Sequence, residues 1–291
     1  GCAPALALVR AAAASPGPLV LIAESAREAE QIGAEMRFFA TAEANLPVLD
    51  FPDWETLPYD AFAPHPDIIA TRLGTLARLP RLERGILVVT VGTLLQRIAP
   101  RSFVDGSSIE LAIGDRLELD ETRRRLDEAG YVNVDQVHEH GEYAVRGSLL
   151  DLFPTGGEVP YRIDLFDEEV ESIRSFDPHT QRSIDRLDRI SLMPAREFPL
   201  TEDGIKTFRA AYRRRFEGDP SRSVIYSEVS RGVPPGGIEY YLPLFFERTA
   251  SVLDYLPAET RFAWRDDLEG AMERSWQELE TRYEQLAHDI E

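Results

Sequence analysis

Short apolar runs alternate with longer amphipathic segments over the first hundred residues of the chain. Residues 19–23, 46–51 and 86–91 are apolar enough to be strands buried on both faces. The segments around them favour helices, because their apolar residues recur near a period of 3.6. These segments are 4–15, 24–40, 67–79 with Asp67 as its expected N-cap, and 92–98. Continuous apolar strands between helices predict a parallel sheet covered on both faces, the doubly wound α/β class.

The pattern changes near residue 108 to one helix followed by short alternating runs. Segment 119–130 predicts a helix that ends at Gly130. The alternating runs, typical of half-buried strands, are 134–140, 142–147, 148–153, 161–166 and 169–176. Turn-forming residues at 155–158 and 167–169 separate some of them, so 161–176 predicts an antiparallel hairpin. We expect a small α+β module that ends near Pro194.

The last hundred residues return to helical patterns. Segment 201–218 begins with Thr201 as a cap, has acidic residues in its first turn and ends at Gly218. Residues 230–246 favour a loop with an aromatic end, and 251–256 and 261–264 are candidate strands. A long helix is expected over 266–290.

Composition narrows the classes of function. The chain of 291 residues carries a net charge of −19, which disfavours the basic face of duplex DNA-binding proteins. Of its 32 basic residues only Lys206 is a lysine, and no glycine-rich turn precedes it, so no Walker-type ATP site is present. A single cysteine, Cys2, excludes intrachain disulfides and fits a reducing cytoplasm, where we expect the protein. No run approaches the roughly 20 apolar residues of a membrane span.

Metal sites and catalytic motifs find little support. His138 and His140 would share one face of a strand, but a third ligand is not evident, so edge histidines are favoured. His65 lies between two prolines and is interpreted as a turn residue. The acidic group Asp164, Asp167, Glu168 and Glu169 lies over the hairpin turn, where carboxylates usually face water.

Two aromatic segments have a functional alternative. The loop 51–67 carries Trp54, Tyr59 and Phe62, and a second cluster lies in 236–246. Packing of both segments on the sheet is the simpler interpretation. The alternative is a platform on which bases stack, which normally lies in a positive groove that Arg72 and Arg78 alone do not make.

Three residues of the α+β module stand out as a contact site. On the strand 161–166, Ile163 and Leu165 are the natural core residues, which leaves Arg162 and Phe166 outward. An outward phenylalanine beside an arginine is typical of a protein contact. Arg146 precedes Gly147 between two strands, and the pattern alone fits a surface residue in a turn or bulge. Residues 109–197 carry about 10 more acidic than basic side chains, so a directional protein contact is favoured over a phosphate track.

These segments also carry a resemblance to a known family. The runs DFPDWETLPYDAFAPHPDIIATRLGTLARLP, HGEYAVRGSLLDLFP, YRIDLFDEE and GIEYYLPLFF resemble the N-terminal, UvrB-like region of bacterial transcription-repair coupling factors (Mfd). The resemblance implies that 1–107 and 196–291 form one UvrB-like domain, a degenerate parallel-sheet domain of the P-loop NTPase motor type. It further implies that 108–195 is an inserted module that binds UvrA.

The resemblance also assigns roles and limits. It implies that Arg146, Arg162 and Phe166 contact UvrA, so that the family directs repair to stalled RNA polymerase. The chain begins GCAPALAL where the phosphate loop would stand, and the hairpin that grips DNA in UvrB is shortened. We therefore expect a non-catalytic fragment without a cofactor. The translocase motor and the contacts with RNA polymerase and DNA would lie outside this chain, and a C-terminal part of the whole protein would mask the UvrA-binding face.

Two other functions stay open on the sequence alone. A nucleotide-binding α/β enzyme would use the edge of the parallel sheet where the strands end. A weak DNA-binding module would use the aromatic loops, and its affinity would fall steeply with salt.

Overall fold

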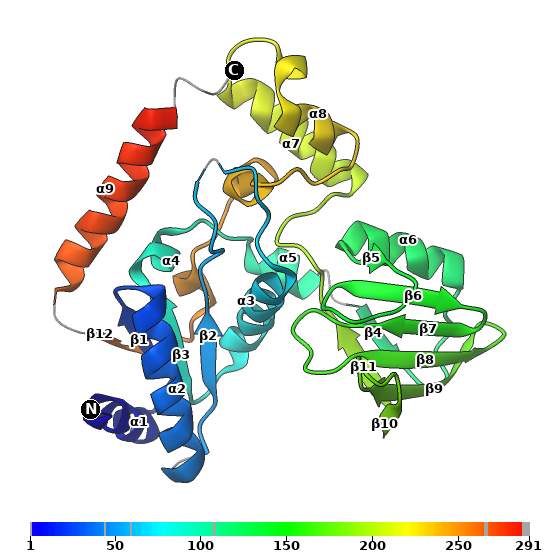
Figure 1. Ribbon diagram of the computed structural model, residues 1–291, viewed down its shortest axis with the longest axis horizontal. Coiled ribbons are helices and arrows are strands. Elements are labelled where there is room, and N and C mark those ends of the chain that lie inside the picture. The colour runs from blue at the N-terminus through cyan, green and yellow to red at the C-terminus, as the bar shows by residue number, and fades with distance from the viewer. Residues whose placement is uncertain (1, 44, 59, 107–108, 265–266, 287–291) are drawn as a thin grey trace.

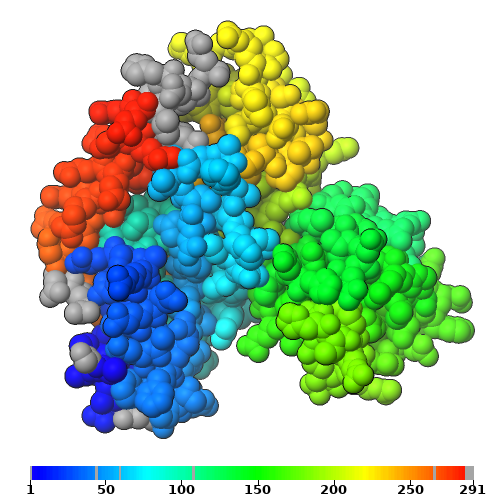
Figure 2. All heavy atoms as spheres, in the orientation of Figure 1, coloured from blue at the N-terminus to red at the C-terminus, as the bar shows by residue number. Residues whose placement is uncertain are grey.

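The computed structural model describes residues 2–43, 45–58, 60–106, 109–264 and 267–286. Figure 1 shows an α/β part, built from both ends of the chain, beside a smaller β-rich module. In Figure 2 the module forms a separate lobe that touches the α/β part along one side. The two parts therefore have separate cores.

A four-stranded parallel sheet forms the centre of the α/β part, in the order β12-β1-β3-β2. Its strands are β1 (Leu19–Ala23), β2 (Val48–Phe51), β3 (Ile86–Thr90) and β12 (Arg261–Trp264). Strands β1 and β3 are buried along their whole length, as their apolar sequences predict. Strand β12 comes from the far end of the chain and pairs in parallel with β1.

Helices cover both faces of this sheet, which confirms the α/β prediction. One face packs on α1 (Ala3–Ala13) and α2 (Ala26–Glu43), where Val9 and Met36 meet Leu21 and Val88. The other face packs mainly on α3 (Pro66–Arg78), where Leu73 and Leu76 share a core with alternate strand residues. The shorter α4 (Val91–Leu95) and α5 (Arg101–Gly106) and the long α9 (Leu268–Leu286) complete that side. The finer assignment to the motor type stays a prediction.

The module contains a six-stranded sheet in the order β10-β9-β8-β7-β6-β5. Its strands are β5 (Val132–Asn133), β6 (Glu142–Arg146), β7 (Leu149–Leu152), β8 (Tyr161–Phe166), β9 (Glu169–Phe176) and β10 (Ser183–Leu187). Strands β6 to β10 are antiparallel, and the predicted hairpin β8–β9 is confirmed. Asp167 makes its turn with a φ of +55°.

One face of this sheet is buried under α6 (Leu119–Ala129) and a two-stranded sheet of β4 (Ile109–Ala112) and β11 (Arg189–Leu192). Leu126 of α6 meets Leu150, Ile163 and Ile173 of the strands. Helix α6 ends as predicted, because Gly130 takes a φ of +98°. The N–H of Tyr131 then reaches back to the carbonyl of Leu126.

Residues 198–246 form an aromatic cluster of their own. This segment contains α7 (Glu202–Arg215), α8 (Val224–Ser230) and the 3₁₀ helix η3 (Ile238–Leu244). The ring of Phe245 packs against the rings of Phe198 and Phe208, with centroids 5.0 and 4.8 Å away. Thr201 caps α7 as predicted, by accepting the N–H of Gly204.

Two predicted strands are wrong, because nearby carboxylates satisfy the backbone instead of a neighbouring strand. Residues 251–256 contain the 3₁₀ helix η4 (Val252–Tyr255), where Asp254 accepts the N–H of Ser251 at 2.6 Å. Residues 134–140 form a loop in which Glu142 accepts the N–H groups of His138 and Glu139 at 2.7 and 2.8 Å. Side chains capture backbone donors in this way where no strand lies alongside.

Helix limits differ from the prediction at several ends. His65, and not Asp67, is the N-cap of α3, and its Nδ1 accepts the N–H of Asp67. Helix α4 ends at Leu95, and α7 ends at Arg215, three residues before Gly218. Part of the predicted closing helix, at 266 and 287–290, lies outside the described residues.

A buried ion pair joins the sheet to the segment that leaves the module. Arg72 of α3 is fully buried, and its Nε donates to Oε1 of Glu197 at 2.7 Å. The Nη1 of Arg72 donates to the carbonyl of Pro52 at 2.6 Å and to Gln96 at 3.1 Å. The indole N–H of Trp54 donates to the other carboxylate oxygen of Glu197 at 2.8 Å. The guanidinium also lies 4.7 Å from the ring centre of Trp54.

A second contact joins the two lobes at the surface. The ring of His140, from the module, lies 2.8 Å from Oδ1 of Asp67 and 2.9 Å from the carbonyl of Gly157. The same ring stacks on Phe153 at 4.1 Å. Nearby, the Cα of Gly156 packs on Gly74 of α3, where a side chain on either residue would clash. These contacts fix the side of the module that faces α3.

The buried pair predicts a large loss of stability when one member is removed. Glu197→Ala leaves Arg72 without its counter-charge in the core, and we expect a loss of about 3–5 kcal/mol in the free energy of unfolding, measured with urea. The double variant Arg72→Met, Glu197→Leu should recover most of it, because neither charge is then buried alone. Glu171→Ala, at an exposed position of β9, is the control and should change stability by less than about 0.5 kcal/mol. A loss below about 1 kcal/mol in Glu197→Ala would contradict this assignment.

Candidate protein-interaction site

The three predicted contact residues lie on the outer face of the six-stranded sheet, on strands β6 and β8, which flank β7. In the register of the sheet, Asp151 of β7 lies between Ala144 of β6 and Arg162 of β8. Two residues earlier on β7, Leu149 lies between Arg146 of β6 and Asp164 of β8. Residues paired across strands share a face. We call Arg146, Leu149, Arg162, Asp164 and Phe166 the docking face.

Phe166 is the exposed apolar member of the docking face. It is 71% exposed at the end of β8, while its neighbours Ile163 and Leu165 are buried in the core. The alternation predicted from the sequence is therefore confirmed. An aromatic ring this exposed gains from being covered, so a contact role is physically reasonable.

A single buried carboxylate holds both arginines of the docking face. Asp151 has no exposed surface, and both of its oxygens bind Arg162, at 2.7 Å from Nε and 2.8 Å from Nη2. The Nη2 of Arg146 donates to the same Asp151 carboxylate. Side-chain exposure is 48% for Arg146 and 19% for Arg162. The expectation of an outward Arg162 is thus only partly correct, because most of its guanidinium is committed to Asp151.

Further contacts fix Arg162 in one orientation. Its guanidinium lies 4.8 Å from the ring centre of Phe176, and its Nη1 donates to the carbonyl of Gln181 at 3.2 Å. The hydrogen bonds to Asp151 raise the pKa of Arg162 above its usual value, and burial opposes them. A shallow hollow of about 570 Å³ borders Arg146 and Arg162 and is also lined by Gln136, Leu149 and Gln181. The arginines therefore present a preformed edge to this hollow.

Gly147 makes the tight turn that follows Arg146. Arg146 and Leu149 face each other across the β6–β7 hairpin, and only Gly147 and Ser148 join them. Gly147 takes a φ of +63°, which a tight hairpin turn needs and glycine allows readily. The turn places Arg146 on the same face as Asp151, so its position reflects a contact with a buried acid as well as exposure to solvent.

Asp151 is the residue that sequence reasoning missed. It lies in the run SLLDLF, where one polar residue between leucines fits an exposed position on a half-buried strand. Its burial depends on Arg162, which lies 11 residues later. The alternation of apolar and polar residues could have indicated the pair, because it places Asp151 and Arg162 on the same outer face of neighbouring strands.

The other candidate residues do not converge. No cluster of three or more histidine, cysteine or acidic side chains placed to hold a metal occurs among the described residues. Glu168 binds Arg116 at 2.5 Å, and His140 binds Asp67. Of the aromatic loop, Trp54 is buried, Phe62 is exposed and Tyr59 lies outside the described residues. The simpler interpretation, packing on the sheet, holds for Trp54.

Comparison with known proteins defines the class of the module first. Residues 109–198 match the family described as "UvrB interaction domain". The docking face lies within this range, and so does Asp151. The module is therefore a UvrB-type interaction domain.

The whole chain is similar to one part of much longer proteins. It is 45% identical to the transcription-repair-coupling factor of Escherichia coli K12 over 290 residues, which are 99% of this chain and 25% of that protein. The corresponding factor of Haemophilus influenzae is 47% identical over 242 residues, 82% of this chain and 21% of that protein. The factor of Bacillus subtilis is 30% identical over 257 residues. The chain belongs to the transcription-repair-coupling factor family and spans about a quarter of the length of these relatives.

Within the described residues, no helix is both long enough and apolar enough to span a bilayer.

The shared carboxylate predicts that Asp151 stabilises the module. Asp151→Ala leaves two guanidinium groups without their partner, one of them mostly buried, and should lower the free energy of unfolding by about 3 kcal/mol. Asp185→Ala, at an exposed position of β10, is the matched control and should stay within about 0.5 kcal/mol. The measurement is urea unfolding followed by circular dichroism. Equal effects of the two substitutions would show that Asp151 does not carry this role.

Proposed function

We propose that this chain is a non-catalytic region of a transcription-repair-coupling factor that recruits UvrA during transcription-coupled repair. The observation that carries the proposal is the exposed ring of Phe166 on the same sheet face as Arg146 and Arg162, within residues matched by the UvrB interaction domain family. Arginines and an exposed aromatic ring on one face fit a protein interface, where aromatic and arginine side chains contribute most of the binding energy.

The preformed geometry supports the same proposal. Asp151 and Phe176 restrict Arg162 before any partner arrives. Binding then requires less ordering of long side chains, which otherwise lowers affinity by about 0.5–1.5 kcal/mol for each side chain. The half-exposed Arg146 is left with donors that can reach a partner's carboxylate.

The whole protein's activity would lie in the remaining length. We propose that the translocase motor, the RNA polymerase contact and the DNA contact belong to the three quarters that this chain does not span. Lys206 is the only lysine and has no phosphate loop before it, which supports a region without ATP turnover or a cofactor of its own.

Binding to UvrA should depend on the ring of Phe166. Phe166→Ala removes an exposed contact, and we expect at least about 30-fold weaker binding to purified UvrA, equivalent to about 2 kcal/mol. Stability should be nearly unchanged, because the ring is not packed in the core. Phe38→Ala is the matched control, since Phe38 is also 71% exposed but lies on α2.

The arginines need a different design. Arg162→Ala would remove two hydrogen bonds from the buried carboxylate of Asp151, so lost binding could reflect altered folding of the module. Arg146→Ala leaves the two hydrogen bonds of Arg162 in place and is the cleaner variant, with Arg116→Ala at an 82% exposed side chain as control. Unchanged UvrA affinity in both Phe166→Ala and Arg146→Ala would reject the docking face.

Masking by the rest of the protein is a second expectation. We propose that a C-terminal part of the whole protein covers the docking face until the motor engages RNA polymerase. This chain should then bind UvrA at least about 10-fold more tightly than the whole protein in the same calorimetric assay, because the whole protein must first open. Equal affinities would contradict masking but would not count against the docking face as the UvrA-binding site.

A further inference from the structure

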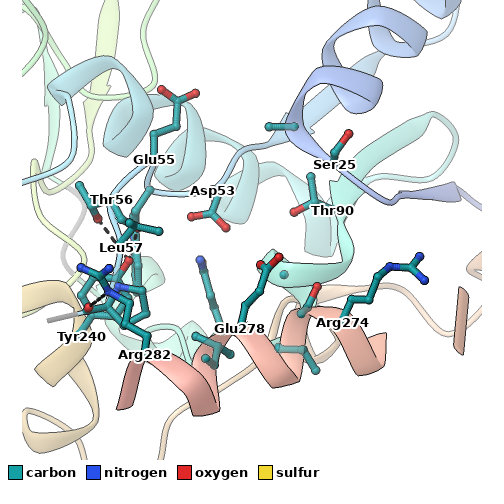
Figure 3. A pocket seen from close by; sticks show the side chains of 18 of the residues that line it. Ser25, Asp53, Glu55, Thr56, Leu57, Thr90, Tyr240, Arg274, Glu278 and Arg282 are labelled. Carbon is teal, nitrogen blue, oxygen red and sulfur yellow. Dashed lines mark hydrogen bonds between the residues drawn. The ribbon is translucent and has the colours of Figure 1, made fainter. Parts of the chain in front are cut away.

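A cavity of about 930 Å³ lies between the carboxyl ends of β1, β2 and β3 and helix α9 (Figure 3). Ser25 follows β1, Asp53 follows β2 and Thr90 ends β3, and all three line it. In open α/β sheets, ligands bind outside the carboxyl ends of the strands. The volume is within the range of small-molecule sites. We call it the crest cavity.

Two carboxylates face each other across the crest cavity. Figure 3 shows Asp53 on the loop after β2 and Glu278 on α9, each pointing into the space between them. Within the described part of the chain, neither makes a hydrogen bond or an ion pair. Carboxylates that share a space without a counter-charge favour a cation between them.

A third carboxylate in the wall is buried and lacks a donor. Glu239 of η3 is 7% exposed and lines the cavity, and its Oε2 has no hydrogen-bond partner within the described residues. A buried acceptor without a donor is costly, and native structures rarely leave one without a reason. A ligand that carries N–H groups would satisfy this oxygen.

The arginines of the lining are largely engaged elsewhere. Arg274 lies 3.7 Å from Glu24 and 3.6 Å from Asp267. Arg282 donates to the carbonyl of Pro58 at 2.6 Å and pairs with Asp60. Arg97 is the remaining guanidinium of the lining, and it is exposed. The charge presented to the cavity is therefore negative, which repels the phosphates of a nucleotide.

The rest of the lining is apolar and aromatic. Trp54 and Tyr240 pack edge to face with ring centres 5.3 Å apart, and the side chains of Leu57, Leu95 and Leu279 line the cavity. No group of acidic or histidine side chains among the described residues is placed to hold a metal ion. Separated carboxylates with apolar surface between them fit a cation whose charges are spaced along a hydrocarbon chain.

We propose that the crest cavity binds a linear polyamine, with its ammonium groups on Asp53, Glu239 and Glu278 and its methylene groups against the apolar wall. The match is in charge and surface: ammonium groups donate to carboxylates, and the chain between them covers the leucine and aromatic side chains. This site is separate from the docking face and does not depend on the UvrA proposal.

Proton linkage supports the assignment. Burial raises the pKa of Glu239 from its ordinary value to about 7, so this carboxyl is partly protonated near neutral pH. An ammonium group binds the ionised form, so affinity should rise as the pH increases from about 6 to 8. The charged groups that act on Glu239 are Glu197, after β11, and Arg72 of α3, and the charged residues Asp53, Glu278 and Arg282 line the same cavity.

Calorimetry with spermidine tests the proposal directly. The protein is titrated at pH 7.5 in physiological salt, and we expect saturable one-site binding. Glu278→Gln and Glu239→Gln should each weaken it at least about 10-fold, because each removes a charge-assisted hydrogen bond. Glu273→Gln, an exposed position on the same helix that does not line the cavity, is the matched control and should bind as the wild type does.

Three outcomes would overturn the site. The first is no saturable binding of spermidine, and the second is an affinity in Glu278→Gln and Glu239→Gln equal to that of the wild type. The third is full displacement of spermidine by magnesium at matched charge, which would indicate diffuse screening of an acidic surface. Micromolar binding of ATP would favour the nucleotide alternative. Phe166→Ala should leave spermidine binding unchanged, so this test and the UvrA test fail independently.

Discussion

The buried pair of Arg72 and Glu197 is the constraint on which the arrangement of this protein depends. Arg72 belongs to the helix that covers the parallel sheet, and Glu197 belongs to the chain as it leaves the module. The pair also fixes Trp54, whose ring forms a wall of the crest cavity. Two charges taken out of water must stay together, because either one alone would be strongly destabilising. The module, the sheet and the cavity wall therefore keep one relative position, which a purely apolar contact would specify less sharply.

The docking face repeats this principle at the surface. Its sheet buries one face under α6, and only a small cluster of Val137, Ala144, Phe153 and Phe176 packs on the other face. Asp151 adds to this cluster by binding two arginines with one buried carboxylate. Phe166 needs no such support, because a ring at the end of a strand has only two rotatable bonds to restrict. The result is a small rigid surface, which lowers the entropy lost when a partner binds.

The apolar pattern predicted most of the fold, and charged residues account for what it missed. Strands such as 19–23 and 86–89 were visible because every residue is apolar and buried. Segment 251–256 is also rich in apolar residues, but Asp254 caps the backbone of Ser251 and the segment forms a 3₁₀ helix. Arg72, Asp151 and Glu197 have the composition of surface residues, yet all are buried. Glu197 lies 125 residues from Arg72, and Arg162 lies 11 residues from Asp151, so the pattern within each single segment does not reveal these pairs.

The two candidate sites present opposite charges: arginines at the docking face and carboxylates in the crest cavity. The chain carries a net charge of −19, so its long-range field repels acidic partners and nucleic acid. At physiological salt that field is screened beyond about 8 Å, and arginines held at the surface can still bind carboxylates at contact distance. The docking face therefore selects a partner by local geometry. Most arginines that line the crest cavity pair with other acids, so at Asp53, Glu239 and Glu278 the same negative excess becomes a source of affinity for cations.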